Sequence, residues 1–360
     1  MSKLFEKLVR PLLFRLEAET AHDFALSALK TGLSSSAAQE RARRRFSVKY
    51  PEPIRRFGLE FENPLGIAAG FDKNGLAIEQ LSALGFGFVE VGTVTLRPQP
   101  GNERPRLFRL PADKALINRL GFNNRGAAAL AESLRKTRRR CVVGINIGKN
   151  KDVPNEEAVE NYVEVLRAVH AEADYIAVNI SSPNTPNLRD LQQAESLDEL
   201  LRALQKTNEA LGRKPLLVKI APDLSDEQIR EAVDICRQNE VAGMIATNTT
   251  ISRDGLLTPD ADQLGAGGLS GRPVAKKSDH VISIIYRHSS GELPIIGVGG
   301  IFSARDAFEK IAAGACLLQA YTGFVYGGPS FARDVNSGLS ELLDQNGFSS
   351  VDDAVGSGVR

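Results

Sequence analysis

Eight short runs of almost uninterrupted apolar residues recur along the chain, and they constrain its fold more than any other feature. They are Leu65–Gly70, Phe88–Thr95, Val142–Gly148, Tyr175–Ser181, Leu216–Ala221, Gly243–Thr249, Pro294–Gly300 and Cys316–Gly323. A strand whose residues are nearly all apolar is buried on both faces, as happens in parallel sheets. The runs therefore predict eight strands of a covered parallel sheet.

Segments with helical periodicity separate these runs. They are Leu76–Leu84, Gly126–Lys136, Glu156–Ala173, Leu197–Leu211, Asp226–Gln238, Ala275–Arg287, Ala304–Ala313 and Phe331–Leu343. Ser225 with Gln228, and Ser303 with Asp306, are helix-capping pairs. Eight strands alternating with eight helices favour an α/β protein built as a (β/α)8 TIM barrel, and the 360 residues leave room for a small extension. A doubly wound sheet is the alternative.

The N-terminal residues predict a two-helix extension. The first helix is basic and amphipathic, with an apolar set and a basic set: Phe5, Leu8, Leu12 and Leu16, and Lys3, Lys7, Arg10 and Arg15. The second starts near Thr20, paired with Asp23, and ends at Gly32. We divide the chain into an amphipathic segment (1–45) that lies on a membrane surface, a catalytic barrel (46–345) and a mobile tail (346–360). The alternative for the helix pair is simple packing onto the barrel.

Composition excludes several classes of function. The net charge of +1 gives no field that would attract nucleic acid. Cys141, Cys236 and Cys316 are too few and too scattered for a disulfide framework or a zinc site, which favours a reducing compartment. No apolar run reaches the length of about 18 residues that a bilayer span needs, and no signal peptide is visible.

Every predicted strand ends in polar residues or glycines, at the edge where barrels of this kind carry their active sites. They are Asp72, Lys73, Thr93, Asn146, Asn179, Ser182, Asn184, Lys219, Thr247, Asn248, Thr249, Gly299, Gly300, Tyr321 and Thr322. Turn chemistry alone places such residues after strands, but eight endings of eight favour a site. The set is rich in amides and hydroxyls, which suits a planar heterocycle with both donors and acceptors on its edges.

The charged and nucleophilic candidates in this set are few. Lys73 and Lys219 are the strand-end cations, and one could meet a substrate carboxylate while the other meets an anionic cofactor. No histidine or cysteine ends a strand, so Ser182 is the remaining candidate for moving a proton. The glycines at 297–300, Tyr321-Thr322-Gly323 and the loop 267–271 indicate a phosphate site for a mononucleotide such as FMN.

Several long motifs resemble class 2 dihydroorotate dehydrogenases, the quinone-dependent, membrane-associated class. They include Asn63–Asn74, Arg97–Asn102, Asn118–Asn124, Asn179–Thr185, Lys219–Asp223, Ala246–Thr250 and Gly267–Arg272. The resemblance covers residues 5–343. It implies oxidation of dihydroorotate to orotate in pyrimidine (UMP) biosynthesis, with a hydride passed to FMN and then to a membrane quinone. It also implies a monomer, peripheral on the cytoplasmic face of the bacterial cell membrane.

The resemblance assigns roles to particular residues. Ser182 falls on the catalytic base, where class 1 relatives carry cysteine, and Lys219 stabilises reduced FMN. The implied FMN site comprises Ala69, Gly70, Phe71, Asp72, Lys73, Thr93, Asn146, Asn179, Lys219, Thr247, Gly271, Gly300, Tyr321 and Thr322. The implied dihydroorotate site comprises Lys73, Asn118, Arg119, Leu120, Gly121, Phe122, Asn179, Asn184, Asn248 and Thr249. The implied quinone contacts are His22, Arg109 and Tyr321.

Two rival functions remain. One is another FMN-dependent barrel oxidoreductase, acting on dihydropyrimidines or dihydrouridine, although such enzymes favour a cysteine that this site lacks. The other is a non-catalytic module that binds a membrane or ligand through residues 1–33. A flavin spectrum in the purified protein separates the second from the first.

Overall fold

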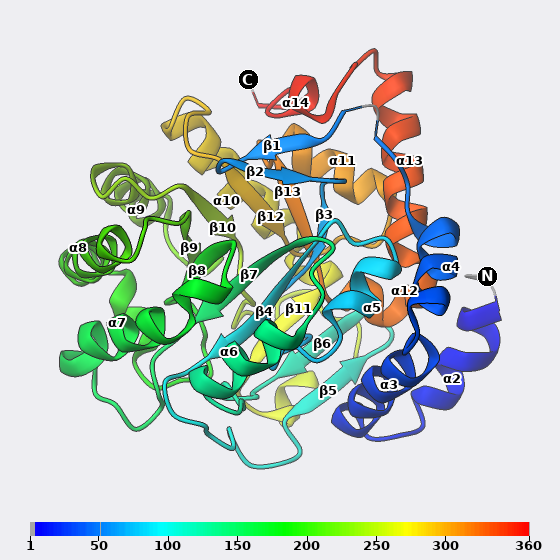
Figure 1. Cartoon of the computed structure of the whole chain (residues 1–360), viewed down its shortest axis with the longest axis horizontal. Coiled ribbons are helices and arrows are strands. Elements are labelled where there is room, and N and C mark those ends of the chain that lie inside the picture. The colour runs from blue at the N-terminus through cyan, green and yellow to red at the C-terminus, as the bar shows by residue number, and fades with distance from the viewer. Residues whose placement is uncertain (1–3, 51, 360) are drawn as a thin grey trace.

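Eight parallel strands close into a barrel at the centre of the molecule (Figure 1). The computed structural model describes residues 4–50 and 52–359. The barrel strands are β3 (Leu65–Ile67), β4 (Phe88–Val94), β7 (Val142–Ile147), β8 (Tyr175–Asn179), β9 (Leu216–Ile220), β10 (Gly243–Ala246), β12 (Ile295–Val298) and β13 (Leu317–Ala320). Closure of the sheet by parallel β9·β10 pairing confirms the barrel and excludes an open doubly wound sheet.

Helices surround the barrel, and all eight expected helical segments form. They are α5 (Ile78–Ala83), α6 (Ala127–Lys136), α7 (Ala158–Val169), α8 (Ala194–Ala210), α9 (Asp226–Gln238), α10 (Ala275–His288), α11 (Ala304–Ala312) and α13 (Phe331–Gln345). Ser225 and Gln228 form the predicted capping box, and Ser303 Oγ accepts from the Asp306 N–H at 3.2 Å. The apolar faces of these helices pack against strands that are buried throughout, which forms the main core.

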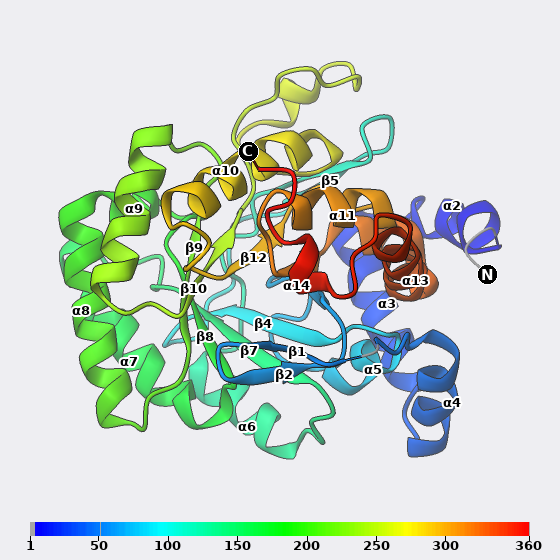
Figure 2. The same ribbon diagram turned by 90° about the horizontal axis from the view of Figure 1, so that it is seen from above.

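The amino-terminal end of the barrel is covered by a hairpin of β1 (Ile54–Arg56) and β2 (Leu59–Phe61), which Figure 2 shows in front of the barrel strands. The C-terminal residues differ from the mobile tail that we expected. Helix α14 (Val351–Ala354) buries two of its residues, and the N–H of Gly356 donates to the Ile311 carbonyl at 3.0 Å. The short apolar side chains of this segment fill space beside α11, which offsets the entropy of ordering it.

The carboxyl end of the barrel carries a small antiparallel sheet that the sequence did not suggest. Its strands are β5 (Leu107–Leu110), β6 (Ala115–Asn118) and β11 (Gly268–Gly271), in the order β11-β6-β5. Our interpretation of 267–271 as a loop was wrong for its last four residues, because their backbone pairs with β6. Single helical turns fill the remaining connections: η2 (Asn155–Glu157), η3 (His170–Glu172), η4 (Leu188–Gln192), η5 (Ala261–Leu264), η6 (Arg272–Val274), α12 (Thr322–Gly327) and η7 (Gly328–Ser330).

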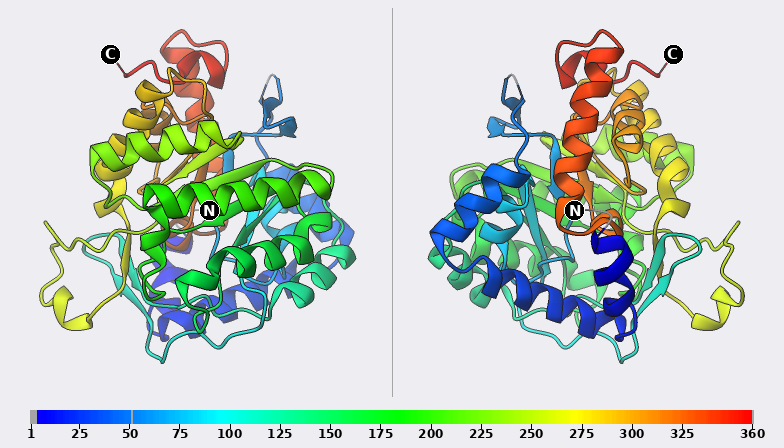
Figure 3. Two further views of the ribbon diagram at one scale, coloured as in Figure 1. Left: turned by 90° about the vertical axis from the view of Figure 1, so that its left-hand side faces the viewer. Right: turned by 90° about the vertical axis from the view of Figure 1, so that its right-hand side faces the viewer.

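The N-terminal segment lies beside this small sheet (Figure 3). It comprises η1 (Phe5–Val9), α2 (Arg10–Leu13), α3 (Ala18–Gly32) and α4 (Ser36–Phe46). Helix α3 ends at Gly32 as predicted, but it begins before Thr20, because Glu17 is its N-cap and accepts from the Thr20 N–H at 2.8 Å. Lys3 of the predicted basic face lies outside the described residues.

Candidate active site

A network of amides and hydroxyls joins the ends of four barrel strands. The Asn179 Nδ2 donates to Thr93 Oγ1 at 2.9 Å and to Asn146 Oδ1 at 3.2 Å. The Asn179 Oδ1 accepts from Ser181 Oγ at 3.1 Å and from Asn248 Nδ2 at 3.2 Å. Thus four of the strand-end residues that we singled out, Thr93, Asn146, Asn179 and Asn248, meet in one amide network, to which Ser181 adds a hydroxyl that the sequence analysis did not single out.

Lys219 is buried beside this network, and its ammonium has no hydrogen-bond partner in the described part of the chain. No hydrogen bond to its ammonium occurs within residues 4–50 and 52–359, and only 5% of the residue is exposed. Burial lowers the pKa of Lys219, and the nearby Glu90 carboxylate acts in the opposite direction. A buried ammonium that faces a pocket without a partner is suited to hold negative charge on a bound molecule.

Glu90 belongs to a polar cluster inside the barrel that the sequence analysis missed. Its carboxylate accepts from Asn146 Nδ2 at 2.9 Å, from the Tyr175 hydroxyl at 2.9 Å and from Gln319 Nε2 at 2.7 Å. Three donors therefore satisfy the two oxygens of this buried side chain. The signal was present, since a glutamate in the middle of an apolar strand such as Phe88–Thr95 is rarely structural filler.

Lys73 lies at the end of β3, on the side of the pocket that faces helix α3. Burial lowers the pKa of Lys73 to about 8, and the carboxylate of Glu19 partly offsets this effect. Asp72, beside it, does not line the pocket. Its carboxylate accepts from the N–H groups of Leu76 and Ala77 at 2.8 and 2.7 Å, so it shapes the turn that leads into α5.

The substrate-binding residues that the resemblance implied converge on the same pocket, with one exception. Leu120, Gly121, Phe122, Thr249 and Asn248 line it, as do Asn118 and Asn184, whose side chains bond to each other at 3.1 Å. Arg119 points elsewhere: its Nη1 donates to the Leu264 carbonyl at 2.5 Å, and its guanidinium stacks on Phe108. Arg119 therefore contributes through its backbone position and not through its side chain.

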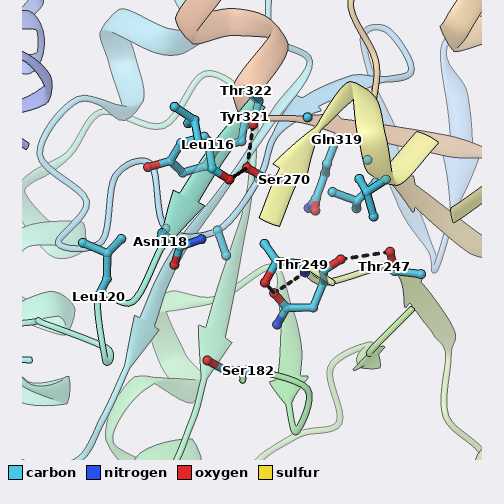
Figure 4. A pocket seen from close by; sticks show the side chains of 18 of the residues that line it. Leu116, Asn118, Leu120, Ser182, Thr247, Thr249, Ser270, Gln319, Tyr321 and Thr322 are labelled. Carbon is cyan, nitrogen blue, oxygen red and sulfur yellow. Dashed lines mark hydrogen bonds between the residues drawn. The ribbon is translucent and has the colours of Figure 1, made fainter. Parts of the chain in front are cut away.

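Ser182 lies at the opposite edge of the pocket from Tyr321 and Thr322 in the view of Figure 4. The residue is 5% exposed, and its hydroxyl accepts from the Asn184 N–H at 3.3 Å, which leaves the hydroxyl proton available to donate. Arg189 fastens this loop, donating to the Ser181 carbonyl at 3.1 Å and to the Thr249 carbonyl at 3.0 Å. The sequence analysis did not single out Arg189, which acts behind the site.

The end of the pocket near β11 and β12 is built from backbone and hydroxyl groups. Ser270 and Thr322 share a hydrogen bond of 2.9 Å (Figure 4). Gly271 and Gly300 have φ of 99° and 76°, and an added Cβ would lie 2.4 Å from the Lys114 carbonyl oxygen and 2.3 Å from Ala275 Cβ. Only glycine fits there, because a side chain would collide with these neighbouring atoms, and both glycines line the pocket. Such a cradle suits a phosphate.

A second, apolar cavity of about 540 Å³ lies between α3, η1 and the barrel. His22, Arg109 and Tyr321 line it, as the resemblance implied for a quinone. Leu107, Leu116 and Tyr321 line both this cavity and the polar pocket, so they form the wall between the two. Burial and the positive charge of Lys73 lower the pKa of His22 to about 4, which keeps its ring neutral at pH 7.

Most of the implied FMN-binding residues line the polar pocket, and three lie behind it. Ala69, Gly70, Thr93, Thr247 and Lys219 contribute directly, with the residues of the glycine cradle. Asp72 accepts from the backbone N–H of Leu76, and Asn146 accepts from the Thr93 hydroxyl. The Phe71 ring packs between the rings of His22 and Tyr321. The signal in the sequence marks which strand ends are polar, but it does not separate lining residues from supporting ones.

Proteins of known family resemble in sequence the chain that forms this polar pocket and apolar cavity. A family model described as dihydroorotate dehydrogenase matches residues 54–343. The chain belongs to the dihydroorotate dehydrogenase family. It is 49% identical to the dihydroorotate dehydrogenase (quinone) of Christiangramia forsetii, with 94% of this chain and 99% of that one covered. It is 50% identical to that of Anaeromyxobacter dehalogenans, with 98% and 96% covered. The predicted membership in the quinone class is confirmed.

A solved structure shows the same fold. The ligand-free DHODH of Eimeria tenella superimposes with a TM-score of 0.87 at 39% identity, with 95% of this chain and 99% of that one covered. Another structure from that organism, in complex with ferulenol, gives a TM-score of 0.85 at 38% identity.

Proposed function

We propose that this protein oxidises dihydroorotate to orotate and delivers the electrons, through bound FMN, to a membrane quinone. The observation that carries the proposal is the shared wall of Leu107, Leu116 and Tyr321, which separates a polar pocket from an apolar cavity. A polar, planar substrate and a lipid-soluble acceptor need different surroundings, and one electron carrier at the wall serves both.

The residues present fit FMN. Within the described residues, the buried Gln319 Oε1 accepts no hydrogen bond and the buried Lys219 ammonium donates none. A flavin ring offers both a donor and acceptors along one edge, so it could hydrogen-bond to both groups. Thr93, Thr247 and the amide network would hold the ring, and Gly271, Gly300 and Thr322 would hold the phosphate. FMN, when bound there, supplies a two-electron acceptor for the hydride from C6 of the substrate.

The chain itself orients the substrate and moves the proton. The Lys73 ammonium binds the carboxylate of dihydroorotate, and Asn118, Asn184 and Asn248 bond to the ring edges. Ser182 takes the proton from C5 as its own hydroxyl proton leaves to water. Lys219 holds the negative charge that develops on the cofactor side of the pocket.

The N-terminal segment (1–45) places the apolar cavity at a membrane surface. Leu4, Leu8, Leu12 and Phe24 are 58–61% exposed, far more than apolar side chains of a barrel core. Each contributes about 2 kcal/mol when it enters the interface, and Lys7 and Arg15 add attraction to anionic lipid. No helix within residues 4–50 and 52–359 has the length and apolarity to cross a bilayer. On the strength of these exposed apolar and basic side chains we propose peripheral attachment to the membrane, and the resemblance further implies a monomer on its cytoplasmic face.

The test is an assay of dihydroorotate oxidation by the purified protein with three acceptors in parallel: a quinone in detergent micelles, fumarate and NAD. We expect a yellow protein that bleaches with dihydroorotate and turns over with quinone alone. Turnover that prefers fumarate or NAD would reject the quinone assignment. If another dihydropyrimidine bleaches the flavin and dihydroorotate does not, the result would favour the rival FMN-dependent barrel oxidoreductase.

A further inference from the structure

A buried ion pair fastens helix α3 to the barrel beside the polar pocket. Arg106 binds both oxygens of Glu19, with Nε–Oε2 at 2.9 Å and Nη2–Oε1 at 2.6 Å, and each side chain is only 7% exposed. Arg104 adds a second bond to Oε1 at 3.1 Å. Ala18, Ala21 and His22 on the same helix line the apolar cavity. Helix α3 therefore lines the apolar cavity with Ala18, Ala21 and His22 and binds the barrel loops through Glu19.

Arg106 passes this contact on to the substrate-binding segments. Its Nη1 donates to the Asn102 carbonyl at 2.7 Å. The Asn102 side chain then donates to the Arg119 carbonyl at 2.9 Å and to the Asn184 carbonyl at 3.4 Å, and its N–H donates to the Leu120 carbonyl at 3.0 Å. Asn102 thus clasps both segments that surround the substrate, and Arg106 holds Asn102.

The same helix also acts on Lys73 electrostatically. Four charged groups face the ammonium: Glu19, Asp23 and Asp72 raise its pKa, and Arg106 lowers it. Glu19 has the largest effect of the four. One turn after Glu19, the His22 ring packs edge-on against Phe71, with centroids 4.9 Å apart, two residues before Lys73.

We infer that the Glu19–Arg106 pair positions the dihydroorotate-binding loops, so that α3 is part of the substrate site as well as a wall of the apolar cavity. This inference rests on the proposed function. Glu19 and Arg106 are positioning residues, because they reach the substrate through Asn102 and through the charge of Lys73. Binding in the two places is then coupled, and the coupling is reciprocal: whatever shifts α3 changes dihydroorotate affinity, and the substrate in turn steadies α3.

The test compares Glu19→Gln and Asn102→Ala with the parent, as holoenzymes. Orotate affinity is measured by calorimetry over a range of pH, and dihydroorotate KM and kcat are measured with a soluble dye, which bypasses the quinone. We expect Glu19→Gln to raise the orotate Kd and the KM by on the order of 10- to 100-fold, with kcat and FMN content kept. Orotate affinity should fall at high pH as the Lys73 ammonium loses its proton. In Glu19→Gln this fall should begin at lower pH, because Lys73 has lost a negatively charged neighbour that raises its pKa.

Asn102→Ala should weaken orotate binding similarly without moving the alkaline limb, since it leaves the ion pair intact. Glu40→Gln is the matched control: it breaks another ion pair between the N-terminal segment and the barrel, with Arg140 at 3.5 Å, and should change neither Kd nor KM. Parental orotate Kd in either test variant overturns the inference, and Asn102→Ala decides alone if Glu19→Gln does not fold. A parent that neither binds orotate nor oxidises dihydroorotate would instead refute the proposed function.

Discussion

The affinity for orotate should fall steeply above pH 8, because Lys73 must be charged to bind a carboxylate. The pKa of Lys73 is lowered by burial to about 8. A bound carboxylate raises that pKa, so its contribution to binding is nearly complete at pH 7 and is lost as pH rises through 8. At pH 7 roughly nine-tenths of the free protein carries the ammonium, and at pH 9 roughly one-tenth does.

The expected consequence is an orotate Kd about tenfold higher at pH 9 than at pH 7, equivalent to about 1.4 kcal/mol. Calorimetric titration of the oxidised holoenzyme at half-unit steps from pH 6.5 to pH 9 measures it. Two substitutions at the same position sharpen the test. Lys73→Met should bind weakly with no alkaline limb, and Lys73→Arg should keep its charge, so whatever affinity it retains should not depend on pH.

A parental Kd that stays constant from pH 7 to pH 9 would refute this account of Lys73. The lysine would then either have an ordinary pKa or lie outside carboxylate contact. If the orotate Kd of Lys73→Met still rose between pH 7 and pH 9, another group of the pocket would be responsible for the pH dependence.

Ser182→Ala should keep FMN and orotate binding but slow single-turnover bleaching by dihydroorotate by on the order of 10²–10⁴-fold; bleaching at the parental rate would eliminate serine as the base. Lys219→Met should make bound FMN harder to reduce, by up to about 4 kcal/mol for charges about 4 Å apart at an effective dielectric of about 20, which spectroelectrochemical titration would detect. Leu8→Glu with Leu12→Glu should abolish vesicle co-sedimentation and quinone turnover, whereas activity with a soluble dye should persist. Because the pKa of His22 is lowered to about 4, the stability it contributes is complete above pH 6.5 and falls toward pH 4 by at most about 3 kcal/mol; His22→Asn should flatten that part of the melting-temperature profile.

The barrel was predictable because its signal is local. Strands such as Tyr175–Asn179 are buried on both faces, and the helices carry an apolar face of their own, with a capping serine before Asp226–Gln238 and before Ala304–Ala312. Neither depends on which distant segment lies alongside. The same holds for the strand-end residues, since parallel closure brings every carboxyl end to one edge of the barrel.

The small sheet at the carboxyl end was not predictable in that way. Strand β11 is the four residues Gly268–Gly271, a glycine-rich stretch that pairs as a strand only because β6 lies beside it. The C-terminal tail, which is rich in glycine and serine, becomes ordered because α10 and α11 present a surface that its few apolar side chains fill. Backbone hydrogen bonds supplied by a distant segment leave no periodicity in the local sequence.

The barrel, the polar strand ends and the family were predictable, because apolar periodicity and long motifs lie within single segments. Which residues line a pocket and which support it depends on how distant segments pack. Packing turns the Arg119 side chain away from the polar pocket, brings the Glu90 carboxylate near Lys219, and places Tyr321 in the wall between the two cavities. These outcomes depend on the direction of a side chain and on partners hundreds of residues away, which burial and charge pairing select only once the chain is folded.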